Sequence, residues 1–131
     1  MTERTVQARW DGGLRAVVQA GGFELLVDEP ESVGGTDRGP QPTDLLLASI
    51  ASCFTLALAH SAGKKSVELA GLDVDVTGRY DGPRFSHIRI VVRAERPSGA
   101  ELDRLISAAE RVCYVTTTLR RSPEIEIVTG S

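Results

Sequence analysis

A long apolar run in the middle of the chain restricts its fold more than any other part of the sequence. From Leu45 to Gly63 there is no charged residue, apart from His60 when that side chain is protonated. Before this run, Pro42 suits the first turn of a helix, and Asp44 places a negative charge near the positive end of the helix dipole. A helix that is apolar on nearly all sides lies either at the centre of a protein core or inside a membrane.

Polar side chains within this run favour the core over the membrane. Hydroxyl, thiol and imidazole groups recur along it, at Ser49, Ser52, Cys53, Thr55, His60 and Ser61. Such groups are poorly accommodated by a bilayer, and the sequence around the run has the patterning of a soluble protein. Residues 1–10 lack the apolar segment of a signal peptide or anchor, so we expect a cytoplasmic location.

Short antiparallel strands are predicted on the N-terminal side of the helix. Apolar and polar residues alternate within residues 1–28, and glycines at 12–13 and 21–22 stand where tight turns between strands are needed. These features predict a meander of three strands. Residues 29–42 are rich in Gly, Pro and Asp and show no periodicity, which is typical of a loop.

Further strands are predicted after the long helix. Residues 72–80 and 88–94 alternate like a pair of antiparallel strands with one buried face, and residues 124–128 predict a last strand. Between the pair and the last strand, Ser98 and Glu101 have the spacing of a capping box at the start of a second helix.

The second helix carries an apolar stripe that leads to Cys113. Its apolar residues repeat at helical spacing, at Leu102, Leu105, Ile106, Ala109 and Val112. The β-branched residues 116–118 weaken the helix beyond this point, which predicts a kink or a new helical start near Cys113. With a length of 131 residues, this order of elements predicts a single α+β domain covering residues 1–131.

The two cysteines, Cys53 in the long helix and Cys113 in the second, are the candidate reactive groups. In a cytosolic protein such thiols are reactive or structural rather than permanently cross-linked. Cys53 lies too deep in its helix to be activated by the helix dipole and would need a nearby cation, whereas a helix that begins at Cys113 would favour the thiolate there. Alternatively, each thiol is a small buried apolar group without chemistry.

A pair of thiols that face one interior is suited to two-step redox chemistry. A thiolate that attacks a peroxide becomes a sulfenic acid, and a second thiol can trap this species as a disulfide before further oxidation. The sequence therefore favours one attacking and one resolving cysteine.

Other classes of site are disfavoured by composition and spacing. The net charge of −3 gives no basic surface for nucleic acid. His60 and His87 lack the spacing of zinc ligands, and the glycine-rich segment 34–39 lacks the Lys-Ser/Thr ending of a phosphate-binding loop. We therefore predict no metal and no cofactor.

The segment from Pro42 to Cys53, PTDLLLASIASC, resembles the first-cysteine helix of the OsmC/Ohr family of thiol-dependent hydroperoxide reductases. Residues 112–115, VCYV, resemble the second-cysteine segment of that family, and the order of elements agrees over residues 9–128. The resemblance implies an OsmC-like fold, with antiparallel sheets around a long central helix, in an intertwined homodimer whose active sites use both subunits. It also implies that Cys53 is the peroxidatic thiol, that Cys113 is the resolving thiol, and that an external thiol reductant restores both.

One position departs from the pattern of the peroxidases in this family. They place a glutamate directly after the motif proline, where it pairs with an activating arginine, whereas this chain has Thr43 there. The acid one position later, Asp44, and two arginines, Arg15 and Arg38, are therefore the candidates for activating Cys53.

Other residues resemble the less characterised branch of the family, which lacks that glutamate. They are Tyr114, directly after Cys113, and the segment from Tyr80 to His87. Two functions follow from the resemblance. The first is reduction of organic hydroperoxides, favoured by the cysteine pair and by apolar helix faces that suit an organic substrate. The alternative, favoured by Thr43, is a non-catalytic protein that binds an apolar small molecule or senses redox state.

Overall fold

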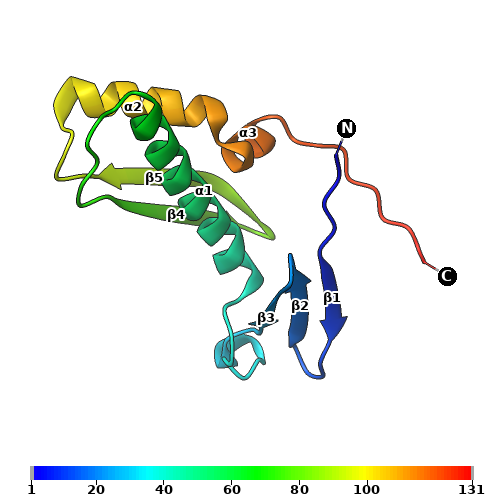
Figure 1. Cartoon of the computed structure of the whole chain (residues 1–131). Helices are drawn as coiled ribbons and strands as arrows, with labels where there is room; N and C mark the ends of the chain where they lie inside the picture. The colour runs from blue at the N-terminus through cyan, green and yellow to red at the C-terminus, as the bar shows by residue number, and fades with distance from the viewer. Residues whose placement is uncertain (1, 131) are drawn as a thin grey trace. The chain divides into compact units, whose positions relative to one another are not determined.

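The computed structural model describes residues 2–130 and separates the chain into two compact units. The first unit ends at Leu46 and the second begins at Leu47, so their boundary falls within the long helix α1. Antiparallel strands and helices both contribute to the fold (Figure 1), which confirms the predicted α+β class.

The first unit contains a three-stranded antiparallel sheet, as the alternation of its residues predicted. Its strands are β1 (Gln7–Trp10), β2 (Ala16–Ala20) and β3 (Phe23–Val27), hydrogen-bonded in the order β1-β2-β3. The glycines at 12–13 and 21–22 form the turns between strands with positive φ angles, from 54° to 87°. Glycine adopts this conformation without steric cost, which explains its use at both turns.

The register of this sheet gathers apolar side chains on one face. Val18 pairs with Ala8 on one side and with Leu25 on the other, and Trp10 pairs with Ala16. Directly paired residues point to the same side of a sheet. We call the resulting surface the apolar sheet face; it consists of Ala8, Trp10, Ala16, Val18, Ala20, Phe23, Leu25 and Val27.

A closely packed loop follows β3 and contains the short 3-10 helix η1 (Glu31–Val33). Two glycines allow its backbone to lie against the preceding residues. A Cβ atom on Gly35 would come within 1.9 Å of the Glu29 carbonyl oxygen, and one on Gly39 within 2.1 Å of the Leu26 carbonyl oxygen. The segment predicted as a loop is therefore a compact structure of defined shape.

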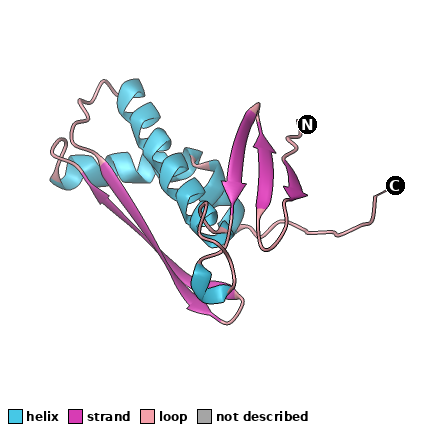
Figure 2. Ribbon diagram, turned by 90° about the horizontal axis from the view of Figure 1, so that it is seen from below, coloured by secondary structure: helices cyan, strands magenta, loops and turns pink. Residues whose placement is uncertain are grey.

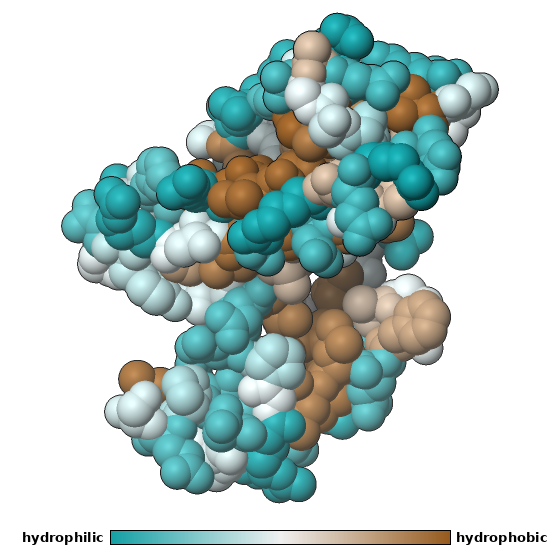
Figure 3. All heavy atoms as spheres, turned by 90° about the vertical axis from the view of Figure 1, so that its left-hand side faces the viewer, coloured by the Kyte–Doolittle hydropathy of each residue, from teal (hydrophilic) through white to brown (hydrophobic). Residues whose placement is uncertain are grey.

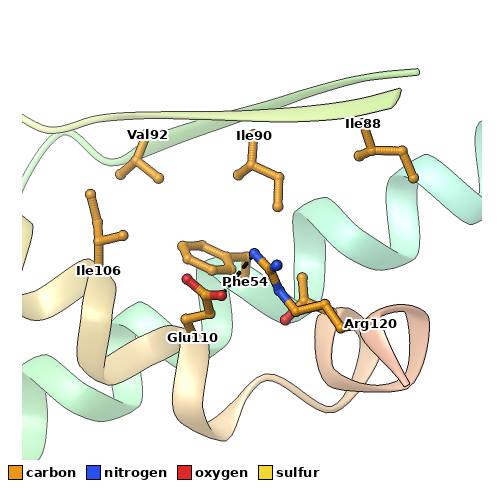
Figure 4. Close-up of a pocket in the computed structure, with 8 residues that line it drawn as sticks. Phe54, Ile88, Ile90, Val92, Ile106, Glu110 and Arg120 are labelled. Carbon is orange, nitrogen blue, oxygen red and sulfur yellow. Dashed lines mark ion pairs between the residues drawn. The ribbon is translucent and has the colours of Figure 1, made fainter. Parts of the chain in front are cut away.

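The second unit combines helices with a β-hairpin. Its elements are the part of α1 (Pro42–Lys64) from Leu47 onward, β4 (Asp73–Asp81), β5 (Arg84–Arg93), α2 (Gly99–Val112) and α3 (Tyr114–Arg120). α1 begins at Pro42, as predicted, and β4 and β5 form the predicted antiparallel pair. Figure 2 shows the hairpin as a long twisted ribbon, and the close-up in Figure 4 shows the helices on one side of it.

The core of the second unit is formed mainly by residues of α1 and α2. Its buried members are Phe54, Ala57, Leu58, Ala62, Leu105, Ala109 and Cys113. Residues of the hairpin, including Val74, Ile90 and Val92, pack against this cluster. α1 is long and apolar enough to cross a membrane by length and composition alone. Leu58, however, has no exposed surface within this core, so the packing supports the predicted role of α1 as a core helix.

The predicted capping box at the start of α2 is not formed. Ser98 is the N-cap residue, but its side chain makes no capping hydrogen bond. Gly99 enters the helix with a φ angle of 58°, in the left-handed region. Because the backbone at this cap departs from the geometry that a capping box requires, the prediction from Ser98 and Glu101 was wrong.

The predicted last strand is also absent from the described part of the chain. Residues 122–130 belong to no strand, and Ile125 and Ile127 are 81% and 93% exposed. A strand needs a neighbour to accept and donate its backbone hydrogen bonds. No strand among residues 2–130 pairs with this segment, so alternation alone gave a wrong prediction.

Candidate functional site

The two cysteines come together within the second unit. Cys53 lies on α1 and is partly buried, whereas Cys113 lies between α2 and α3 and has no exposed surface. Both are free thiols, and a hydrogen bond joins the Cys53 thiol to the sulfur of Cys113. The structure thus places next to each other the two side chains that the sequence singled out.

The backbone explains the position of Cys113. This residue has extended angles, with φ −81° and ψ 108°, and it both ends α2 and begins α3. Three threonines, at 116–118, follow in α3, and the Thr116 hydroxyl donates to the Cys113 carbonyl oxygen at 3.4 Å. The predicted new helical start at Cys113 is therefore confirmed.

Hydrogen bonds stabilise the thiolate form of Cys113. Burial raises the pKa of this thiol, but hydrogen bonds from the hydroxyl and backbone N–H of Thr116, from the Cys53 thiol and from the Val115 N–H outweigh it. The pKa of Cys113 is therefore lowered below its ordinary value. The environment of Cys113 therefore favours its negative charge.

A largely apolar cavity of about 300 Å³ lies in the same unit as the cysteines, although neither cysteine is among its lining residues. Phe54 follows Cys53 in α1, and Thr116 is hydrogen-bonded to Cys113. Figure 4 shows the apolar side chains of β5 facing Phe54 and Ile106 across the cavity. The complete lining is Phe54, Ile88, Ile90, Val92, Ile106, Glu110, Thr116 and Arg120.

A single ion pair lies on the wall of this otherwise apolar cavity. Glu110 Oε2 and an Arg120 Nη atom are 2.8 Å apart, and both side chains are well exposed. A second cavity of about 220 Å³ shares Ile88, Ile90 and Arg120 with the first. The two cavities therefore offer a largely apolar surface along β5 with one charged group at its margin.

The candidate acid and one of the candidate arginines have exposed side chains. Asp44 lies in the first turn of α1, where a negative charge stabilises the helix dipole. Arg38 is exposed in the loop after β3, and its backbone N–H donates to Asp28. Among residues 2–130, no side-chain hydrogen bond or ion pair is assigned to either of them.

The other candidate arginine, Arg15, is held by hydrogen bonds. Its Nη1 donates to the Thr36 hydroxyl at 3.3 Å, and its Nη2 donates to the Asp11 carbonyl oxygen at 3.2 Å. Its Nε lies 3.6 Å from the Asp11 carboxylate. The side chain is only 22% exposed. The guanidinium of Arg15 is therefore fixed within the first unit.

Sequence reasoning missed a buried carboxylate beside this arginine. Asp28 is 1% exposed, and its two oxygens accept four hydrogen bonds, from the Glu29 N–H, the Thr36 N–H and hydroxyl, and the Arg38 N–H. Burial raises the pKa of this carboxyl, but the hydrogen bonds outweigh it and lower the pKa to about 2. The sequence did contain a signal for this site, because Asp28 is an acid that stands directly after the apolar strand β3 and before a glycine-rich loop.

The family assignment rests on a match that covers more than half of the chain. The family model described as OsmC-like protein matches residues 35–128. The YmaD protein of Bacillus subtilis, an uncharacterised protein, is 21% identical over 134 residues, which cover 93% of this chain and 89% of YmaD.

Solved structures share the fold at low sequence identity. The OsmC like protein of Mycoplasma pneumoniae superposes with a TM-score of 0.76 at 18% identity, over 92% of this chain and 89% of that protein. An organic hydroperoxide resistance protein from Elizabethkingia anophelis superposes with a TM-score of 0.68 at 24% identity, over 89% of each chain. With its fold, its cysteine pair and the match to the family model, the chain belongs to the OsmC-like family, whose structural relatives include OsmC and Ohr proteins.

Proposed function

We propose that this protein reduces organic hydroperoxides by a two-cysteine mechanism. The Cys53 thiolate attacks the distal oxygen of the peroxide, the O–O bond breaks, and the alcohol leaves after taking up a proton. Cys53 is then a sulfenic acid. The Cys113 thiolate attacks the Cys53 sulfur, a disulfide forms, and the hydroxide that leaves becomes water with one more proton. An external thiol reduces the disulfide and returns both cysteines to their starting state.

The contact between the two thiols carries this proposal. A resolving cysteine must reach the sulfenic acid before a second peroxide does. The hydrogen bond between Cys53 and Cys113 supports this step, because it keeps the two side chains close to each other. The lowered pKa of Cys113 adds support, because resolution needs a thiolate as the attacking group.

The surroundings of the thiols favour an organic substrate. A cavity in the same unit is lined by aliphatic and aromatic side chains on β5, α1 and α2, among them Phe54, the neighbour of Cys53 in the chain, with the Glu110–Arg120 ion pair as its charged feature. An alkyl group gains free energy by entering such a cavity, whereas hydrogen peroxide does not. Structural relatives named as organic hydroperoxide resistance proteins point to the same substrate class.

We further propose that the protein acts as a homodimer in the cytoplasm, where thiols are kept reduced. Apolar side chains remain at the surface (Figure 3), among them Trp10 and Phe23 on the apolar sheet face, 76% and 75% exposed. Residues 124–128 alternate like a strand but have no partner within the described chain. A second copy can supply both a cover for the sheet face and a neighbour for this segment.

A second candidate function is favoured by the first turn of α1. Thr43 stands where the family's peroxidases have a glutamate, and a neutral side chain cannot form an ion pair with an arginine. If the missing ion pair leaves Cys53 without activation, the protein would bind an apolar molecule in the cavity or sense redox state, without efficient turnover of peroxide.

One experiment separates these functions. The reduced protein is mixed with one equivalent of cumene hydroperoxide or of H₂O₂, and intact mass and free thiols are followed with time. We expect rapid loss of two hydrogens per chain and a Cys53–Cys113 disulfide, faster with the organic peroxide. In Cys53→Ser the reaction should stop. In Cys113→Ser one equivalent should leave Cys53 as a sulfenic acid, and a second equivalent should over-oxidise it. Two thiols that stay free in the wild-type protein would rule out peroxidase activity and support the binding function.

A further inference from the structure

A groove lined by basic side chains runs along α2 in the second unit. It consists of two adjoining cavities, of about 610 Å³ and 350 Å³, which share Ser107 and Arg111. Its walls come from α2, from α3 and from the residue that follows α1. We call it the basic groove and define it by Lys65, Arg104, Ser107, Arg111, Thr117 and Arg121.

The helical repeat places the groove residues of α2 in one row. Arg104, Ser107 and Arg111 are three and then four positions apart, which is the spacing of neighbours on one face of a helix. All three are exposed. Arg104 and Arg111 are two turns apart, or about 10 Å along the helix axis. The row therefore offers two guanidinium groups with a hydroxyl group between them.

Positive charge in the basic groove is only partly compensated. Its lining contains five basic and two acidic residues, although the whole chain has a net charge of −3. Glu110 is paired with Arg120, which leaves Asp103 as the other acid of the lining. Within residues 2–130, no ion pair is assigned to Lys65, Arg104, Arg111 or Arg121. The excess of positive charge in a concave surface attracts anions.

The two hydroxyl groups of the basic groove are not used by their own helices. Thr116 and Thr118, the other threonines of α3, donate to backbone carbonyls of the preceding turn at 3.4 Å and 2.7 Å. For Ser107 and Thr117, no such bond is assigned within the described part of the chain. Their hydrogens are therefore available to a ligand.

We propose that the basic groove binds a phosphorylated small molecule that carries at least two phosphate groups. Guanidinium groups donate paired N–H bonds to phosphate oxygens, and hydroxyl groups add single donors between them. A ligand with several phosphates can reach cations that are spread over two helical turns, whereas a single phosphate cannot. The inference goes beyond the proposed peroxidase function, since neither Cys53 nor Cys113 lines the groove.

The size of the basic groove and the charge around it favour a small molecule over a nucleic acid. Its larger cavity, of about 610 Å³, has the volume typical of small-molecule sites. Because the whole chain is negative, the residues outside the groove have an excess of acids. A strand that extended past the groove would meet this negative charge.

To test the inference, the reduced full-length protein is titrated with inorganic tripolyphosphate by isothermal calorimetry at low salt. We expect saturable binding of one tripolyphosphate per chain. The affinity should fall as KCl is added, because salt screens the exposed charges of the groove. Orthophosphate and the tricarboxylate citrate should bind more weakly, because they carry less charge and fewer phosphate oxygens.

Two matched pairs of variants locate the site. Arg111 lines both cavities, so Arg111→Gln should weaken binding about tenfold through the loss of a charge-assisted hydrogen bond. Arg89→Gln makes the same change of charge at an exposed position of β5 and should bind as the wild type does. Thr117→Val should weaken binding several-fold, whereas Thr118→Val should not, because the Thr118 hydroxyl is already bonded to the backbone.

Several results would overturn the inference. They are a lack of saturable binding, citrate binding as tight as that of tripolyphosphate, and equal affinities in Arg111→Gln and Arg89→Gln. If Arg111→Gln does not fold, Arg104→Gln at the other end of the row replaces it, and wild-type affinity in that variant would contradict the proposal. Cys53→Ser should bind tripolyphosphate as the wild type does, so the binding site and the peroxidase function can fail separately.

Discussion

Glu110 on α2 and Arg120 on α3 form an ion pair, with 2.8 Å between Oε2 and an Nη atom, that joins the helices on either side of Cys113. Cys113 itself interrupts the backbone helix at this point. The ion pair is thus a side-chain link across a break in the main chain. It also lies on the wall of the cavity between β5 and the helices (Figure 4).

Removing this link should loosen α3 at little cost in overall stability. Both side chains are largely exposed, so Arg120→Ala should lower the free energy of unfolding by less than about 1 kcal/mol. Labelling of the buried Cys113 thiol should nevertheless become several times faster. The control is Arg93→Ala, which removes the comparably exposed Arg93–Asp75 pair on the hairpin. Equal labelling of Cys113 in both variants would show that the ion pair does not hold α3.

Thr116→Val should raise the pKa of Cys113, because it removes the hydroxyl that hydrogen-bonds to the thiolate. A thiol whose pKa is lowered in the folded state stabilises the protein above its unfolded pKa, and this stabilisation is lost as the pH falls through the folded pKa. Under reducing conditions, the free energy of unfolding of the wild-type protein should therefore rise with pH across that window. The rise should be smaller in Thr116→Val and absent in Cys113→Ser, as measured by urea unfolding at several pH values. An equal pH dependence in all three proteins would contradict this assignment.

Two glycine substitutions should change stability in opposite directions. Gly63 lies in α1 with no positive φ, and a Cβ atom added there would have no neighbouring atom within 4 Å, so Gly63→Ala should stabilise the protein by up to about 1 kcal/mol. Gly35→Ala should instead destabilise it by about 1–3 kcal/mol, because the new Cβ would collide with the Glu29 carbonyl. Thermal unfolding measures both. If Gly35→Ala leaves the stability unchanged, the loop is less tightly packed than the structure indicates.

The C-terminal segment should be needed for the proposed homodimer. Ile125 and Ile127 share one side of an extended segment, and both are exposed in the single chain. The double variant Ile125→Lys/Ile127→Lys should dissociate the dimer in sedimentation velocity experiments, because charges would replace the apolar side of the strand. Glu126→Lys, on the opposite side, is the control and should leave the association state unchanged. A wild-type protein that sediments as a monomer would refute the homodimer itself.

Sequence predicted the parts of this structure that depend on neighbours along the chain. The helical start at Pro42 and the break at Cys113 follow from local propensities, and the structure has both. The last strand was predicted wrongly because a strand depends on a partner that alternation does not reveal. The capping box failed because the left-handed angle at Gly99 cannot be read from Ser98 and Glu101.

The candidate site was predictable only in part, because it also depends on contacts between residues that are distant in the sequence. Both cysteines were visible as isolated thiols in apolar segments, but their hydrogen bond depends on how α1 packs against the α2–α3 junction. The network of Asp28, Thr36 and Arg15 joins residues that are far apart along the chain, and no periodicity marks it. Resemblance to a family suggested Arg15 as one candidate cation, and the structure shows its side chain hydrogen-bonded to Thr36 and Asp11.

The complete burial of Cys113 has a consequence for how oxidative damage would be distributed in a cell. An oxidant or alkylating agent that diffuses through solvent meets Cys53, which is partly exposed, and finds no surface of Cys113. Irreversible sulfinic and sulfonic products should therefore accumulate at Cys53 alone, while oxidation of Cys113 stays limited to the reversible disulfide. In a survey of protein thiols, the amount of irreversibly oxidised Cys53 relative to Cys113 would record how much oxidant the protein has met. Cys113 would serve as the internal reference.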